Sequence, residues 1–167
     1  MMRAYFLIAF TLLTAAGCTN MPSWSEPILH PGRENEIRKQ ERVESLEQRH
    51  AATKLKAAQV HFAAGDTAKC RPLVDEALEL RPNSAAALRL AAEVALAEDR
   101  GADAIVFYRR LVEQRPDDAQ SHHWLGVALE VEGQVIEANR HFERAAQLAP
   151  DNPIYRLSQL PTDPPAF

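Results

Sequence analysis

The chain has 167 residues, of which 46% are hydrophobic and 25% charged, and its formal net charge is −4 at pH 7. This length gives room for one domain of ordinary soluble composition. The acidic balance, with no Lys- or Arg-rich block along the chain, argues against a nucleic-acid partner. Cys18 lies at the end of an apolar leader and Cys70 stands alone in the body, so packing without a disulfide must stabilise the fold.

The first residues have the pattern of a secretory signal. Arg3 supplies a positive charge, and residues 4–13 form an almost wholly apolar stretch that is too short to span a bilayer. Residues 14–18 read Thr-Ala-Ala-Gly-Cys and resemble the lipobox of bacterial lipoproteins. That resemblance implies that residues 1–17 are a signal peptide and that Cys18 is lipidated. The alternative is an ordinary signal peptide with a chance cysteine.

Thr19 indicates which membrane the lipid would enter. It stands where, by analogy with the lipoprotein family, an Asp would retain the protein in the inner membrane. We therefore expect an outer-membrane lipid anchor with the protein facing the periplasm. Residues 18–33 are rich in Pro and Ser, which predicts an extended tether between the lipid and the domain.

Residues 34–50 are dense in charged side chains and predict a mostly solvated helix, with Asn35 as its N-cap. No Pro or Gly intervenes before residue 51, so this helix is expected to run on into the next segment. A stripe of Val43, Leu46 and His50 is expected to pack against that segment. The alternative interpretation is a partner-binding helix.

An internal period organises the rest of the chain. Pro82, Pro116 and Pro150 are evenly spaced along the sequence. Taking each Pro as position 32 of a repeat gives repeats of 51–84, 85–118 and 119–152, which follow one another without a gap. Mostly small residues then recur at three positions, where helices cross closely: Ala58, Ala92 and Gly126 at position 8; Cys70, Ala104 and Ala138 at position 20; Ala77, Leu111 and Ala145 at position 27.

This pattern resembles the tetratricopeptide repeat (TPR), a helix-turn-helix unit with the same period. The resemblance implies an all-α solenoid of three repeats with a long N-terminal helix. Asn152 followed by Pro153 predicts a short capping helix over residues 153–160, and Pro164 and Pro165 predict a disordered tail over 161–167.

Some residues depart from the TPR pattern. Lys54, Leu88 and His122 stand where the family often has Trp, and Pro72 is expected to remove a hydrogen bond from its helix. The middle repeat has its glycine at Gly101, two positions later than the others, which predicts an irregular turn.

The TPR resemblance also implies a binding groove, because the first helix of each repeat lines the concave face in this family. The implied face mixes apolar and charged side chains and would suit an extended or helical peptide. Its expected members are Leu55, Gln59, Phe62, Arg89, Glu93, Gln120, His123, Trp124, Val127 and Glu130. Trp124 has two interpretations, a binding anchor or a packing residue between repeats.

The groove lacks the carboxylate clamp of chaperone-binding TPR domains. That clamp uses Lys, Asn and Arg at fixed positions to hold a terminal carboxylate. The matching residues here are Leu55, Gln59, Leu90, Gln120 and Trp124. Recognition by shape and apolar contact is therefore expected.

Catalytic patterns are weak, and we expect neither an enzyme nor a cofactor or metal. His61, His122, His123 and His141 share no metal-motif spacing, although His122 and His141 fall on packing helices and are expected to approach each other. Cys70 sits at a small-residue position and is expected to be a buried, inert thiol.

These observations predict a membrane-anchored scaffold that binds a protein partner in the cell envelope. Its build is similar to TPR lipoproteins of tight-adherence (Flp) and type IV pilus assembly, which implies a pilotin-like role toward a secretin or pilus component. The alternatives are an adaptor for peptidoglycan synthases or hydrolases, and an enzyme using the histidines or Cys70.

Overall fold

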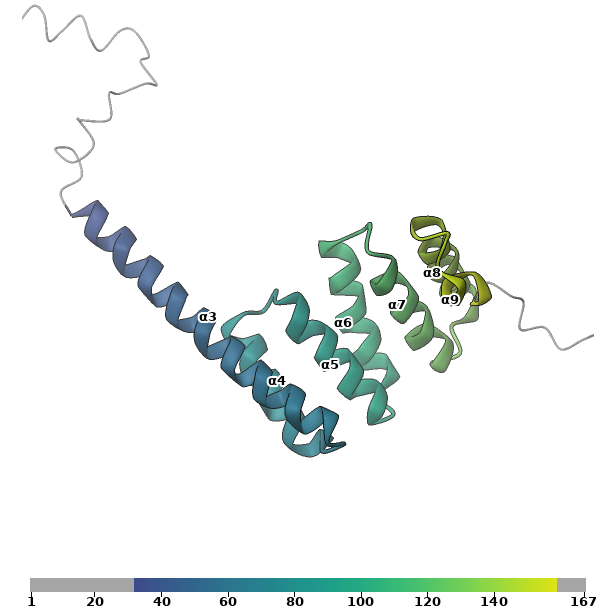
Figure 1. Ribbon diagram of the computed structural model, residues 1–167, viewed down its shortest axis with the longest axis horizontal. Coiled ribbons are helices and arrows are strands. Elements are labelled where there is room, and N and C mark those ends of the chain that lie inside the picture. The colour runs from purple at the N-terminus through teal and green to yellow at the C-terminus, as the bar shows by residue number, and fades with distance from the viewer. Residues whose placement is uncertain (1–31, 159–167) are drawn as a thin grey trace, which may run out of the picture. The chain divides into compact units, whose positions relative to one another are not determined.

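The computed structural model describes residues 32–158, so the expected signal peptide, Cys18, most of the tether and the tail lie outside the described residues. This range is helical in seven segments joined by short turns (Figure 1). By contact it divides into two units, 32–44 and 45–158. The helices are α3 (Arg33–Ala63), α4 (Thr67–Leu80), α5 (Ala85–Ala97), α6 (Gly101–Gln114), α7 (Ala119–Val131), α8 (Val135–Leu148) and α9 (Pro153–Leu157).

The first turns of α3 form the smaller unit. The helix begins at Arg33, directly after Gly32, whose carbonyl accepts a hydrogen bond from the Glu36 amide at 3.1 Å. Asn35 therefore lies inside the first turn, and its expected role as N-cap is wrong. Gly32 has a φ of +94°, which L-residues rarely adopt and which lets the chain enter the helix at this point.

The second part of α3, within residues 45–158, is the first helix of the first repeat. Its buried side carries Ala51 and Ala58, two helical turns apart. Leu46 and His50 are exposed because they lie on a different side of the helix from these alanines. Leu46 and His50 of the expected stripe therefore do not pack against the first repeat, and Val43, in the smaller unit, is exposed as well.

Three helical hairpins carry the core, and the small residues at their crossings are buried as expected. The pairs are α3 with α4, α5 with α6, and α7 with α8. Ala58 and Ala92 are fully buried, as are Cys70 and Ala104 on the second helices. The fold class predicted from the repeat period is confirmed. Larger residues fill the space beside each crossing, namely Val74, Tyr108 and Phe142 at position 24.

The turn inside each hairpin is the same in all three repeats. The amide after the left-handed residue donates to a carbonyl in the last turn of the preceding helix: Asp66 to His61, Arg100 to Ala95 and Gln134 to Leu129, at 2.8–2.9 Å. Gly65 and Gly133 occupy the left-handed residue with φ of +76° and +72°, and Asp99 takes φ +55° there. The expected irregularity of the middle turn is wrong, because Asp is one of the few L-residues that tolerate this conformation.

Each hairpin is linked to the next through a turn that contains the periodic Pro. The side chain of Ser84 accepts from the Ala87 amide and that of Asn152 from the Ile154 amide, as expected of N-caps. Asp118 instead accepts the Ser121 hydroxyl. Arginines at equivalent positions also join consecutive repeats at these turns: Arg110 donates to the Pro82 carbonyl, and Arg144 to Asp117.

Gly126 generates a direct test of the small-residue crossings. A Cβ added there would lie 2.5 Å from the Phe142 ring, which is itself buried. We expect Gly126→Ala to lower the free energy of unfolding by about 1–3 kcal/mol, because the ring or the helix must shift. Urea denaturation followed by circular dichroism measures this.

Gly101→Ala is the matched control. The three atoms nearest the new Cβ there all belong to the flexible Glu132 side chain, which can move aside. We therefore expect the free energy of unfolding to change by no more than about 1 kcal/mol, with the higher helix propensity of Ala favouring an increase. Equal losses in the two variants would show that the α7–α8 crossing has no special demand for a small residue.

Candidate functional site

The ten expected groove residues lie on the first helices of the three repeats, and eight of them share three positions of the repeat. Leu55, Arg89 and His123 share one position of the repeat, and Gln59, Glu93 and Val127 share another. Because the repeats fold alike, equivalent positions recur along one side of α3, α5 and α7. We call this set of ten the A-helix face. Gln59, Gln120 and Glu130 are exposed, and the other seven are partly buried: Leu55, Phe62, Arg89, Glu93, His123, Trp124 and Val127.

The α3 part of the A-helix face is apolar and tied to the core. Leu55 and Phe62 pack against a buried cluster that includes Cys70 and Leu90. Each therefore contributes to folding with its inner surface and leaves an outer surface for a ligand. Gln59, one turn after Leu55, is exposed beside them.

The centre of the face carries opposite charges on α5. Arg89 and Glu93 lie one helical turn apart, both partly buried. Burial raises the pKa of the Glu93 carboxyl, and the positive charge of Arg89 opposes that rise. Beneath them, Tyr108 of α6 is 1% exposed and its hydroxyl has no partner among the described residues. Burial raises the pKa of Tyr108 strongly, with a smaller contribution from Glu93.

The C-terminal end of the face is an aromatic cluster around His123. The His123 ring lies 5.0 Å from Tyr155 of α9, 5.5 Å from Trp124 and 5.7 Å from Phe142, between ring centroids. The Ser158 hydroxyl also lies 3.5 Å from His123 Nδ1. The sequence predicted the capping helix but not that Tyr155 would contact a groove residue, because that contact depends on how the turn at Pro150 and Asp151 directs α9 back toward α7.

The position of Trp124 is compatible with both of its interpretations, packing residue and binding anchor. Its ring packs against the buried cluster centred on α5 to α8, so it has a packing role. It is only partly buried, and it stands at the edge of the His123 cluster. The ring therefore retains accessible surface next to the exposed groove positions of α7.

His122 and His141 approach each other as expected. Their Nδ1 atoms are 2.9 Å apart, and His122 Nε2 lies 3.1 Å from the Pro116 carbonyl oxygen. Since a carbonyl only accepts, His122 Nε2 carries a proton and its Nδ1 accepts from His141 Nδ1. His122 is 7% exposed. The pair thus fastens α7 to α8 and to the preceding turn.

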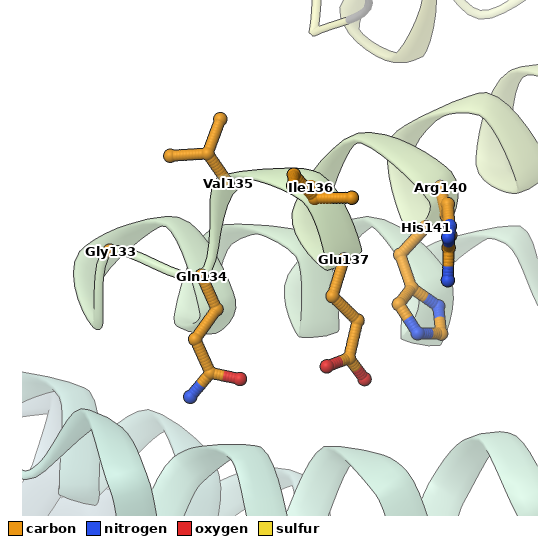
Figure 2. A pocket seen from close by; sticks show the side chains of 7 residues that line it. All are labelled: Gly133, Gln134, Val135, Ile136, Glu137, Arg140 and His141. Carbon is orange, nitrogen blue, oxygen red and sulfur yellow. The ribbon is translucent and has the colours of Figure 1, made fainter.

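Two cavities lie away from the A-helix face. One, of about 510 Å³, is lined by Gly133 and by residues of α8; Gln134, Glu137 and His141 point to the same side, and Val135 points away (Figure 2). The other, of about 320 Å³, involves α4, α5 and α6 and is lined in part by Arg71, Asp75 and Arg100. Both arginines form ion pairs with Glu98, and Arg100 also pairs with Asp103.

Neither a metal site nor a reactive thiol is assembled in the part of the chain that the structure describes. Within residues 32–158, no group of three or more His, Cys, Asp or Glu side chains is placed to hold a metal ion. Cys70 is fully buried, and burial raises the pKa of its thiol, which disfavours the reactive thiolate. No helix within this range is both long enough and apolar enough to cross a bilayer.

Two partly buried histidines predict a loss of stability in acid. Burial lowers the pKa of His141, with a further contribution from the charge of His122, and burial also lowers the pKa of His123. The unfolded chain, with His pKa near about 6.5, then binds more protons than the folded chain below that pH. The free energy of unfolding should fall between pH 7.5 and 5.5, by at most about 1.4 kcal/mol per pH unit for each histidine.

Urea denaturation of His141→Gln at both pH values tests this assignment. Glutamine keeps a donor for His122 but does not titrate, so the fall in stability between the two pH values should be smaller than in the unchanged chain. An undiminished fall would exclude His141 as a source of the acid sensitivity.

Two family models match the chain, both described as tetratricopeptide repeat. One covers residues 61–126 and the other residues 119–152. Together they span the second helix of the first hairpin and both later hairpins. No curated protein sequence matches the chain significantly.

Solved TPR structures share the fold at low sequence identity. The second TPR domain of human RPAP3, in complex with the HSP70 peptide SGPTIEEVD, has a TM-score of 0.63 at 15% identity, covering 68% of this chain and 94% of that one. A crystal structure of MamA has a TM-score of 0.63 at 17% identity, covering 84% and 82%.

An enzyme is also among the similar structures. A mutant O-GlcNAc transferase of Thermobaculum terrenum has a TM-score of 0.61 at 23% identity, but the likeness covers 68% of this chain and only 22% of that enzyme. The likeness therefore shows the fold alone. With the repeating hairpins described above, these matches identify the chain as a tetratricopeptide repeat protein, a fold typical of protein-interaction scaffolds.

Proposed function

We propose that the A-helix face binds a peptide or helix of a partner in the cell envelope, and that lipid on Cys18 holds the protein at the outer membrane, facing the periplasm. The observation that carries the proposal is the recurrence of equivalent, partly exposed residues along α3, α5 and α7. A surface that repeats with the solenoid matches the linear character of a peptide better than that of a compact small molecule.

The face carries apolar side chains that would give affinity and charged side chains that would fix the register of a bound segment. Leu55 and Phe62 at one end and Trp124 at the other offer apolar surface that is already held in place by the core. Between them, Arg89 and Glu93 provide opposite charges one turn apart. A bound segment would bury apolar side chains at both ends, and its own charges would be aligned by the central pair.

Recognition differs from that of the peptide-bound neighbours. RPAP3 domains are solved with the peptides SRMEEVD and SGPTIEEVD, both ending in Asp. This chain has Leu55, Gln59, Leu90, Gln120 and Trp124 at the positions of a carboxylate clamp. We therefore expect an internal segment of the partner to bind, rather than a chain terminus.

The N-terminal sequence supports the membrane anchor. Residues 14–18 have the lipobox pattern, and acyl chains contribute about 0.8 kcal/mol for each buried methylene, so several chains hold a protein durably. The Pro-rich segment up to residue 33 would let the repeats reach partners away from the bilayer.

A pilotin-like role toward a secretin or pilus component is the client class that we propose. It rests on architecture, since a lipid-anchored TPR protein can hold an envelope subunit near the membrane where it assembles. Binding to peptidoglycan synthases or hydrolases is the alternative, and the experiment below separates the two.

Crosslinking pulldown from envelope membranes tests the binding face. Arg89→Glu places two acidic side chains one turn apart at the centre of the face, and we expect it to reduce recovery of the partner at least about tenfold. Arg115→Glu, an exposed residue in the turn after α6, makes the same charge change away from the face and should leave recovery unchanged.

Each outcome bears on a different part of the proposal. A secretin or pilus subunit lost only from Arg89→Glu supports face and client class together. Cell-wall enzymes lost from that variant would keep the face and replace the client class. Equal recovery from both variants would exclude the face. The anchor is tested separately, because Cys18→Ala should abolish incorporation of labelled palmitate.

A further inference from the structure

A second surface lies at the end of the solenoid, on the side of α3 that faces away from the hairpins. Leu46, His50, Thr53, Ala57 and Val60 recur with alternating spacings of four and three and so form one stripe along the helix. We call this stripe the open edge. Leu46 and Val60 are each 64% exposed, although both are large and apolar.

In the second and third repeats, the positions equivalent to part of this stripe are buried against a neighbouring helix. Position 10 of the repeat is Val60, Val94 and Ala128; Val94 is 1% exposed and Ala128 is 0%. Position 3 behaves alike, because Thr53 is exposed whereas Ala87 and Ser121 are buried. In those repeats the positions are covered because α5 packs on α4, and α7 on α6.

The open edge is therefore the continuation of the interface that joins one repeat to the next. Within residues 32–158 this stripe has no comparable cover, because Leu46, Thr53 and Val60 of α3 are all exposed. Terminal repeats of a solenoid usually carry a polar outer face for solubility. Here two large apolar side chains remain at that face: Val60, whose equivalents Val94 and Ala128 are buried, and Leu46, which extends the same stripe ahead of the first repeat.

The charged residues beside the open edge favour some covering helices over others. Arg49 and Lys56 are exposed and lie two helical turns apart, so they line one flank of the stripe. In an antiparallel pair of two copies centred on Thr53, Leu46 would face Val60 of the second copy, but Arg49 would face its Lys56. This arrangement juxtaposes like charges, so an antiparallel second copy is disfavoured. A parallel pair would bring Arg49 near Lys54 of the second copy, whose ammonium is already paired with Glu76.

We infer that the open edge binds an amphipathic helix from another protein, with an apolar stripe and acidic residues beside it. The apolar stripe would cover Leu46 and Val60 as α4 covers Val94, and the acidic flank would pair with Arg49 and Lys56. This surface is separate from the A-helix face and does not depend on the function proposed for it.

Two designed helical peptides of about three heptads test the inference. They share one apolar stripe of Leu and Ala, and they differ only in having Glu or Lys along the flanks. Fluorescence anisotropy with the purified full chain should show at least about tenfold tighter binding of the Glu peptide. Leu46→Ser with Val60→Ser should abolish that binding, whereas Val106→Ser, an exposed valine on α6, should not.

Charge reversal gives the sharpest readout. Arg49→Glu with Lys56→Glu should exchange the preference, so that the Lys peptide binds more tightly than the Glu peptide. Arg89→Glu should leave the preference unchanged, which separates this surface from the A-helix face. All the changed open-edge side chains are exposed, and unchanged thermal unfolding by circular dichroism would verify that the variants fold.

Several results would overturn the inference. The first is absence of binding by the Glu peptide, or binding that survives loss of Leu46 and Val60. The second is sedimentation of the unchanged chain as a dimer that the Leu46/Val60 variant loses, which would assign the edge to a second copy. The third is binding to phosphatidylglycerol vesicles that the same variant loses, which would assign it to a membrane surface.

Discussion

The close crossing of two helices at small residues is the constraint on which the rest of this structure depends. Ala58, Ala92 and Gly126 allow each first helix to approach its partner, and at Gly126 the Phe142 ring leaves no room for a methyl group. Because this crossing and its turn recur once in every repeat, the hairpins stack in the same way each time. The A-helix face is a consequence, since equivalent side chains then fall along one side.

The two ends of the solenoid differ in whether another helix covers them. At the C-terminal end, α9 returns onto α7 and places Tyr155 against His123, so the last hairpin has a cover. At the other end α3 leaves Leu46 and Val60 exposed, although the equivalents of Val60 in the inner repeats are buried. The protein therefore offers two kinds of surface, a face along its first helices and an apolar edge at its first repeat.

The period predicted the fold because it reports packing directly: the residues that recur in the sequence at positions 8, 20 and 27 are buried in the structure. Predictions from the sequence were wrong where they rested on a local preference alone. Asn35 is a residue type that favours the N-cap position, but the helix already begins at Arg33, directly after Gly32. The middle turn lacks a glycine at its left-handed residue, yet Asp99 adopts the conformation because the hairpin closes identically. The exposure of Leu46 and the contact of Tyr155 with His123 depend on neighbours, which no single helix pattern contains.

Site-specific photocrosslinking in cells tests most directly whether the A-helix face is where a partner binds. A photoreactive residue would replace Gln59, Gln120 or Glu130, the exposed members of the face, or else Glu79, Glu113 or Glu143, exposed residues of the second helices. The account predicts that one envelope protein crosslinks from the first three positions and not from the second three. Crosslinks confined to the second helices, or equally frequent from both sets, would contradict it.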